Sequence, residues 1–218
     1  MFRPFLLLLL SLTVLSAKAS AGSITDTTNR NSLLYNGVEY TRGYNYNNET
    51  PFFQGNEFLQ GEIRYTGNLY TSVALQYDCI DDVVILKDPL MARRMLLIKE
   101  KVDEFTLGGR HFIKLGWLGT KGEFYEELYK GKRSVLVQWK KNVVLNMSLQ
   151  ERYILEKTTY LLEGKTLTKI TKASELTKRM GDKKKKIQQY YRANDLSFRN
   201  DPETAAVRLV QKAEAEGW

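Results

Sequence analysis

Short apolar runs with a two-residue period, separated by turn residues, fill the chain from about residue 35 to residue 170. Two pairs of runs have the turn chemistry of tight hairpins: 60–65 and 69–78 flank Thr66-Gly67-Asn68, and Val102–Leu107 and Arg110–Leu115 flank Gly108-Gly109. Further runs cover 83–86, 124–129, 134–140 and 152–162. The pattern predicts a mainly β fold, an antiparallel meander that curls into a barrel or a sandwich.

The period changes to that of helices after residue 170. Ser174 and Asp182 are expected N-caps of two short helices, and Asp201-Pro202 is the start signal of a third that runs toward Glu216. Apolar residues of this third helix recur at helical spacing and form a narrow stripe. We therefore expect a β domain over 22–170 and a short α-helical C-terminal region over 171–218.

The first 21 residues have the features of a cleavable secretory signal. Arg3 precedes a short apolar stretch over 5–15, and small-x-small sites follow at 17–19 and 19–21, which predict a mature start at Ser20 or Gly22. The stretch is shorter than the roughly 20 residues of a membrane-spanning helix, so a cleaved signal is favoured over a membrane anchor. The sequence thus predicts an exported protein, periplasmic or associated with the outer membrane.

Charge and cysteine content narrow the picture. From residue 20 to residue 164 the chain has 18 basic and 18 acidic residues, whereas 165–218 has 13 basic and 7 acidic residues, so the C-terminal region carries the excess positive charge. The single cysteine, Cys79, allows no internal disulfide, and we expect it to be buried on a strand.

No motif in the chain indicates a particular chemistry. The lone histidine, His111, excludes a multi-histidine metal site, and no nucleophile elbow, phosphate loop or dinucleotide fingerprint is present. Acidic residues cluster at 78–82 and 123–127, which suggests calcium binding or glycosidase chemistry as alternatives. The first cluster lacks the spacing of a calcium-binding loop. A glycosidase needs two carboxylates that face each other across a cleft, and the sequence does not show that geometry. We expect Glu126 to pair with Lys132 or Arg133, and we expect no cofactor or metal.

Two surfaces are candidates for contact with a partner. Tyrosine combines an apolar face with a polar tip, and aromatic residues cluster in the expected loop over 44–53, with Tyr44, Tyr46, Phe52 and Phe53 as its proposed contact residues. Four consecutive lysines form the second candidate, together with the aromatic residue one turn on: Lys183, Lys184, Lys185, Lys186 and Tyr190. Export removes most of the case for nucleic acid, so an acidic protein surface or an anionic membrane is the expected partner.

The order of several turn and aromatic elements resembles a family of uncharacterised exported β-rich proteins of the Bacteroidota that end in a Lys-rich helical tail. The elements are Tyr65-x-Gly67-x-x-Tyr70, Leu75-x-Tyr77-Asp78, Val102-x-x-Phe105, Gly122-x-Phe124-Tyr125-Glu126 and Tyr129-x-Gly131. The resemblance implies a location in a Gram-negative envelope and assigns no activity.

These observations together favour an exported, non-enzymatic envelope protein, a binding or accessory component that acts through a curved β surface and a basic helical tail. A glycan-directed hydrolase using carboxylate chemistry and a small outer-membrane barrel remain alternatives. The expected partners are a protein or an anionic membrane surface, with no nucleic acid.

Overall fold

The computed structural model describes residues 23–24, 33–41, 50–91, 93–117, 121–145, 151–179 and 183–217. The predicted signal sequence over 1–21 therefore lies outside the described residues. Ser23–Ile24, the first described residues, form a short strand directly after the predicted cleavage sites.

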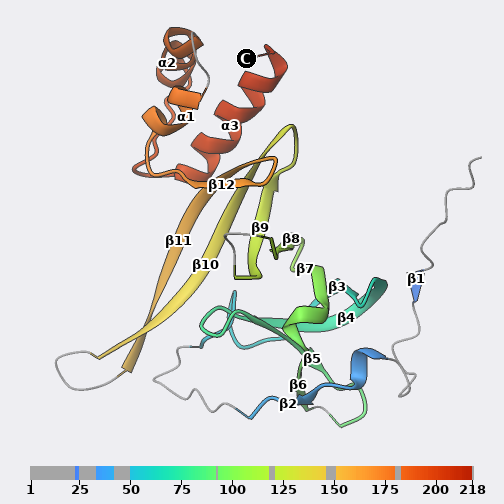
Figure 1. The fold of residues 1–218 in the computed structure, drawn as a ribbon. Helices are drawn as coiled ribbons and strands as arrows, with labels where there is room; N and C mark the ends of the chain where they lie inside the picture. The colour runs from blue at the N-terminus through green and yellow to red at the C-terminus, as the bar shows by residue number, and fades with distance from the viewer. Residues whose placement is uncertain are drawn as a thin grey trace, which may run out of the picture.

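A single, predominantly antiparallel sheet dominates the described part of the chain (Figure 1). The order across the sheet is β12-β11-β10-β9-β8-β7-β3-β4-β5-β6-β2, and β1 pairs in parallel with β4. The sheet does not close, since β12 and β2 are its two edges. The prediction of a mainly β antiparallel meander is confirmed. The strands are β1 (Ser23–Ile24), β2 (Val38–Glu39), β3 (Leu59–Tyr65), β4 (Asn68–Asp78), β5 (Val83–Lys87), β6 (Arg94–Leu96), β7 (Val102–Leu107), β8 (Arg110–Leu115), β9 (Glu123–Tyr129), β10 (Arg133–Leu145), β11 (Glu151–Glu163) and β12 (Thr166–Lys169).

Both predicted hairpins form where the turn residues accept a left-handed backbone. Thr66 and Gly67 have φ values of 52° and 79° between β3 and β4, and Gly108 and Gly109 have φ values of 57° and 78° between β7 and β8. Positive φ at both central residues is the requirement of the hairpin turn whose twist matches that of the flanking strands.

Aromatic packing fills the main core, which lies between β3, β4, β5, β7, β8 and β9. Phe105 and Phe112 stack with ring centroids 4.8 Å apart, and Phe124 meets Phe105 edge-on at 5.2 Å. Cys79 is buried in the same cluster, as predicted, although it lies in the turn directly after β4 and not on a strand. Burial raises the pKa of its thiol to about 12. The thiol is therefore protonated and inert at neutral pH.

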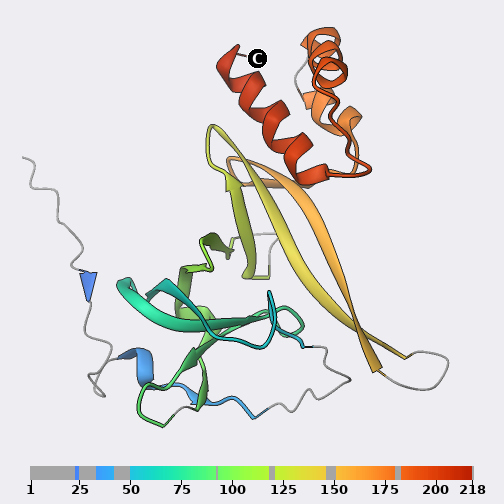
Figure 2. The ribbon, with the colours of Figure 1, turned by 180° about the vertical axis from the view of Figure 1, so that it is seen from behind.

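The β10–β11 hairpin is the longest element and reaches beyond the rest of the sheet. Its strands pair over their full length, from Arg133 opposite Glu163 to Leu145 opposite Glu151. The neighbouring strand β9 pairs with β10 only as far as Val137. Figures 1 and 2 show the three helices at one end of this hairpin and its loop end at the other.

Three helices form the C-terminal region: α1 (Ala173–Arg179), α2 (Lys184–Ala193) and α3 (Pro202–Ala215). Their apolar faces meet strands β10 and β11 in a second core that includes Leu161, Leu176, Ile187 and Leu209. The helical region is thus packed on the sheet. No helix in the described part of the chain has the length and apolar character to cross a membrane.

The helix starts were predicted with mixed success. Asp201 is the N-cap of α3, its carboxylate accepting a 3.0 Å hydrogen bond from the Thr204 amide, as expected. Ser174 as an N-cap was wrong, because α1 begins at Ala173 and the amide of Thr171 is bonded by Glu175 instead. Asp182 lies outside the described residues.

Candidate functional site

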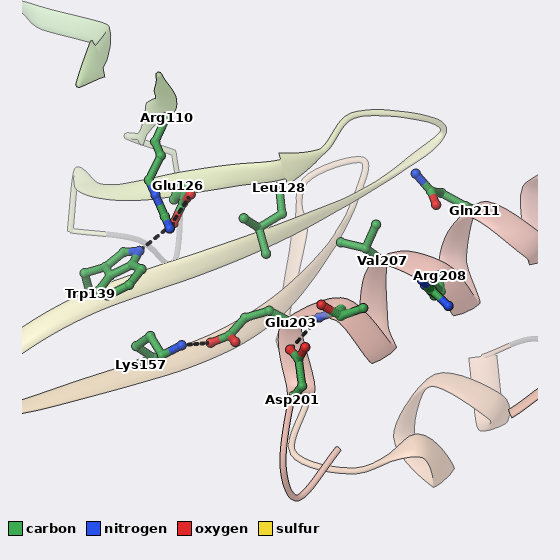
Figure 3. A pocket seen from close by; sticks show the side chains of 11 residues that line it. Arg110, Glu126, Leu128, Trp139, Lys157, Asp201, Glu203, Val207, Arg208 and Gln211 are labelled. Carbon is green, nitrogen blue, oxygen red and sulfur yellow. Dashed lines mark hydrogen bonds and ion pairs between the residues drawn. The ribbon is translucent and has the colours of Figure 1, made fainter. Parts of the chain in front are cut away.

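A hollow of about 530 Å³ lies where β9, β10 and β11 meet the first turns of α3 (Figure 3). We call it the Trp139 groove. Its walls combine one aromatic ring, three cations, three carboxylates and a short apolar floor. The lining residues are Arg110, Glu126, Leu128, Trp139, Lys157, Asp201, Glu203, Thr204, Val207, Arg208 and Gln211.

Glu126 organises one end of the groove. Its carboxylate, only 5% exposed, accepts hydrogen bonds from the Arg110 guanidinium at 2.9 and 3.1 Å and from the Trp139 indole N–H at 2.7 Å. A buried carboxylate that accepts charge-assisted bonds from a guanidinium is strongly held. The network therefore fixes the orientation of the indole ring.

Trp139 is also packed from the core side and covered by cations. The Phe53 ring meets it edge-on at 4.8 Å. The Arg110 guanidinium lies 5.5 Å and the Lys157 ammonium 5.3 Å from its ring centroid, both within the range of cation–π attraction. Trp139 is thus a rigid, partly buried aromatic anchor.

The α3 end of the groove carries the second ion pair. The Lys157 ammonium, on the strand directly opposite Trp139, lies 2.7 Å from a Glu203 carboxylate oxygen in the first turn of α3. The Asp201 cap lies beside it, and the hydrogen bond from the Thr204 amide lowers the pKa of the Asp201 carboxyl. An acidic residue in the first helical turn also interacts favourably with the helix dipole.

An apolar floor separates the two polar ends. Figure 3 shows Leu128 from β9 and Val207 from α3 facing each other across the groove, with Gln211 farther along the same helix. Three cations and three carboxylates line the groove, so its formal charge is zero. The arrangement suits a ligand that places an apolar group on the floor and polar groups on both sides.

The structure corrects the predicted partner of Glu126. Neither Lys132 nor Arg133 reaches it, since the Arg133 guanidinium is bonded to Glu163 at 3.0 Å. The partner is Arg110, because β8 and β9 pair with Phe112 opposite Glu126, which puts Arg110 one diagonal step away. The pairing of adjacent strands, which sequence spacing does not reveal, decides the contact.

His111 lies on β8, 34% exposed, between two carboxylates. Its Nε2 is 3.4 Å from Glu104 and its Nδ1 is 3.3 Å from Glu127.

The acidic group at 78–82 is occupied by protein donors. Asp78 is fully buried and accepts bonds from the Tyr40 hydroxyl at 2.8 Å and the Ile80 amide at 2.8 Å, while burial raises its pKa. Asp82 is bonded to the Tyr77 hydroxyl and the Lys99 ammonium, both at 2.6 Å. Among the described residues no group of three or more histidine, cysteine or acidic side chains could hold a metal ion.

The expected aromatic contact surface lies partly outside the described residues. Tyr44 and Tyr46 lie outside the described residues. Phe52 and Phe53 are each only 3% exposed, so their assignment to an exposed patch was wrong. Phe53 packs in the main core against Phe112, and Phe52 packs against Tyr40, because the segment before β3 folds back onto the sheet.

The lysine run is on the surface, as a contact surface requires. Lys183, Lys184, Lys185 and Lys186 are all exposed at the start of α2. The next residue, Ile187, is buried and holds the helix to the second core. Tyr190 is half-buried, with the Lys212 ammonium 5.7 Å from its ring centroid, so it belongs to the helix packing more than to the basic face.

Sequence reasoning missed the residues that build the groove: Arg110, Trp139, Lys157 and Glu203. One signal was present in the sequence, since Trp139 stands between the polar residues Gln138 and Lys140 near the end of an apolar run. An aromatic residue between two polar residues of a strand is a candidate for a partly exposed contact residue. Its neighbours on α3 could not be inferred, because they depend on where the helix docks.

No protein family model, characterised protein or solved structure matches the chain.

Proposed function

We propose that the protein is an exported, non-enzymatic binding component of the cell envelope that holds a polypeptide partner in the Trp139 groove. The supporting observation is the prearranged indole of Trp139, fixed by Glu126 and Arg110 beside an apolar floor. Rigid aromatic anchors at the centre of a contact surface contribute much of the binding energy in protein interfaces, because little side-chain entropy is lost when they are covered. Export rests on the predicted signal sequence.

A polypeptide fits the groove better than a sugar. Arg110 and Lys157 lie over the Trp139 ring and Phe53 packs against it, so only part of the side chain stays exposed, which suits a contact with one polypeptide side chain better than the face-to-face stacking of a sugar. The floor formed by Leu128 and Val207 suits an apolar side chain of a protein. The cations and carboxylates at both ends can bond main-chain groups on either side of that side chain.

A glycan hydrolase is the weaker alternative. That chemistry needs a carboxylic acid whose pKa is raised, so that it can donate a proton near neutral pH. Glu126 is instead held by a guanidinium, Glu203 is paired with Lys157, and the pKa of Asp201 is lowered by its capping bond. The lowered pKa of Asp201 disfavours proton donation by this residue, and the ion pairs hold the other two carboxylates in place.

The exposed lysines of α2 add a second attachment in this proposal. Residues Lys183 to Lys186 face away from the second core, and each cation near an anionic surface contributes about 1 kcal/mol. The run would hold the protein reversibly at an anionic envelope surface while the groove selects the partner.

Site-specific photo-cross-linking tests the groove. A photoreactive residue at the exposed position Gln211, which lines the groove, is expected to cross-link an envelope protein in producing cells. Trp139→Ala should reduce that product at least about tenfold, as loss of a central aromatic anchor does. Trp117→Ala is the matched control, because Trp117 lies outside the groove and bonds the Lys165 carbonyl. A cross-link that survives Trp139→Ala in a folded protein would contradict the proposal.

A further inference from the structure

A second hollow, also about 530 Å³, lies between strands β5 and β6 and the segment 56–58 that precedes β3. These strands are at the end of the molecule away from the three helices (Figure 1). We call this site the Arg94 hollow. Its lining residues are Tyr40, Asn56, Glu57, Phe58, Lys87 and Arg94, and it shares none of them with the Trp139 groove. Its volume is in the range of sites that hold a small organic molecule.

Two cations of the Arg94 hollow lie on neighbouring strands without a counter-charge. In the antiparallel pair of β5 and β6, Lys87 lies directly opposite Arg94. Like charges in directly opposite positions repel each other and destabilise a sheet. Arg64, Arg110 and Arg133 each bond a carboxylate. In the described part of the chain, neither Lys87 nor Arg94 forms an ion pair of this kind. An anion from outside the chain would remove this repulsion.

Neutral groups hold the Arg94 guanidinium in place. Its Nε donates to the Gln76 side-chain carbonyl at 3.1 Å, and its Nη2 donates to the Asn56 side-chain carbonyl at 2.9 Å. Gln76 is only 2% exposed, and its amide nitrogen donates to the Asn56 backbone carbonyl, so its orientation is fixed. A guanidinium has more N–H donors than these two bonds use. Within the described residues the outer side of the guanidinium, at Nη1, therefore stays available to a ligand.

Aromatic rings lie beside both cations. The Arg94 guanidinium is 5.1 Å from the ring centroid of Phe52 and 5.8 Å from that of Phe58, and the Lys87 ammonium is 5.8 Å from the Phe58 centroid. The rings displace water from one side of each cation, which strengthens the attraction of an anion on the other side. Phe52 is buried, whereas the half-buried Phe58 lines the hollow and offers an apolar surface to a ligand.

The charges that line the hollow favour one class of anion. Lys87 and Arg94 together with the exposed carboxylate of Glu57 give a formal charge of +1. One carboxylate brings this charge to zero, whereas a phosphate monoester, which carries nearly two negative charges, would leave an excess. The two oxygens of a carboxylate also match two coplanar N–H groups of a guanidinium. The Asn56 side-chain nitrogen, oriented by the bond between its carbonyl and Arg94, is a further donor.

We propose that the Arg94 hollow binds a small organic monocarboxylate whose apolar part lies on the Phe58 ring. Arg94 binds both carboxylate oxygens, Lys87 supplies the second positive charge, and Asn56 donates to one oxygen. The bound carboxylate removes the repulsion between the two opposed cations. A free acid and the C-terminus of a short peptide present the same chemistry, and the experiment separates these two sources. This site is independent of the Trp139 groove and of the partner proposed for it.

NMR titration of the full protein, expressed with its own leader and purified, tests the ligand class. Phenylacetate is expected to shift the backbone amide signals of residues 56–58 and of the strands that carry Lys87 and Arg94. Phenylacetamide, which lacks the charge, and phenyl phosphate, which carries an excess charge, should each bind at least about tenfold more weakly. An N-acetylated dipeptide ending in phenylalanine identifies the source, because tighter binding than phenylacetate assigns the site to a peptide terminus and weaker binding assigns it to a free acid. Equal binding of the amide, tighter binding of the phosphate, or no shift at these residues would overturn the proposal.

Three glutamine variants test the charges of the hollow. Lys87 is exposed, so Lys87→Gln should fold normally and weaken phenylacetate binding about fivefold. Arg93→Gln is the matched control, because it removes a neighbouring cation that pairs with Asp88 outside the hollow, and it should leave the affinity unchanged. Glu57→Gln removes a competing negative charge and should tighten binding about threefold. Equal weakening by Lys87→Gln and Arg93→Gln, or weaker binding by Glu57→Gln, would contradict a site built by these residues.

A conservative substitution tests the two-point contact with the guanidinium. Arg94→Lys retains a positive charge but cannot present two coplanar N–H donors, so phenylacetate binding should fall about tenfold. Unchanged affinity would exclude this contact. Circular dichroism checks the fold of the variant, because the bonds to Gln76 and Asn56 are also lost. If this variant does not fold, the result for Lys87→Gln decides. None of these measurements depends on the Trp139 groove.

Discussion

Asp201 fixes the start of α3, and its contribution can be measured directly. Its carboxylate accepts the Thr204 amide at 3.0 Å, so Asp201→Ala leaves a helix donor without its cap. We expect the free energy of unfolding to fall by about 1 kcal/mol, measured by denaturant titration. Asp201→Asn retains a capping oxygen and should lose much less. Equal losses in the two variants would contradict the capping role.

Single residues were predictable where the cause is local. The Asp201 cap, the turn residues Gly67 and Gly108, and the burial of Cys79 all follow from chain-local rules. The partner of Glu126 was not predictable, because it depends on the pairing of β8 with β9. The burial of Phe53 was missed for a related reason: an irregular segment can fold back onto the sheet without any periodic signal.

At the scale of elements, the basic start of α2 gives a testable surface. Replacing all four lysines from Lys183 to Lys186 with glutamine removes four cations that together contribute roughly 4 kcal/mol near an anionic bilayer. We expect binding to vesicles with anionic lipid, measured by cosedimentation, to fall sharply. Moderate salt should weaken vesicle binding of the unchanged protein in the same way, because it screens the charges.

A charge-matched control separates position from net charge. Glutamine at four other exposed lysines, Lys165, Lys169, Lys172 and Lys178, lowers the net charge equally but spares α2. This variant should keep most of its vesicle binding. If both variants lose binding equally, only net charge acts, and if neither loses any, the lysine run is a solvated face.

Elements were predicted well where turns punctuate the chain and poorly where they do not. The two glycine-containing hairpins formed as expected, with both central residues at positive φ. The run over 152–162 predicted β11 to within one residue at each end, but the run over 134–140 underestimated β10, which continues to Leu145. The alternation fades in that distal part, where exposed apolar residues such as Val143 and Leu145 lie. The Trp139 groove was beyond prediction, because it exists only where α3 docks on that hairpin.

At the scale of the whole molecule, the main core and the core under the helices share strand β10. Trp139 on this strand packs against the main core, and Val135 four residues earlier belongs to the core under the helices. Glu214 of α3 adds a polar link, accepting the Tyr129 hydroxyl at 2.9 Å and the Arg133 amide at 2.6 Å. A continuous strand between two cores couples their unfolding, because neither core can open without exposing β10.

Leu209→Ala tests this coupling. Leu209 is buried in the helical core, so the substitution should cost about 2–5 kcal/mol. Thermal unfolding would be followed by helical circular dichroism and by Trp139 fluorescence, with Trp117 and Trp218 replaced by phenylalanine. Both signals should shift to the same lower midpoint, since a cavity under α3 destabilises the core that β10 shares. Leu145→Ala, at a position 64% exposed, is the matched control and should shift neither. Loss of the helical signal at a lower temperature than an unchanged Trp139 signal would mean that the helices form an independent unit.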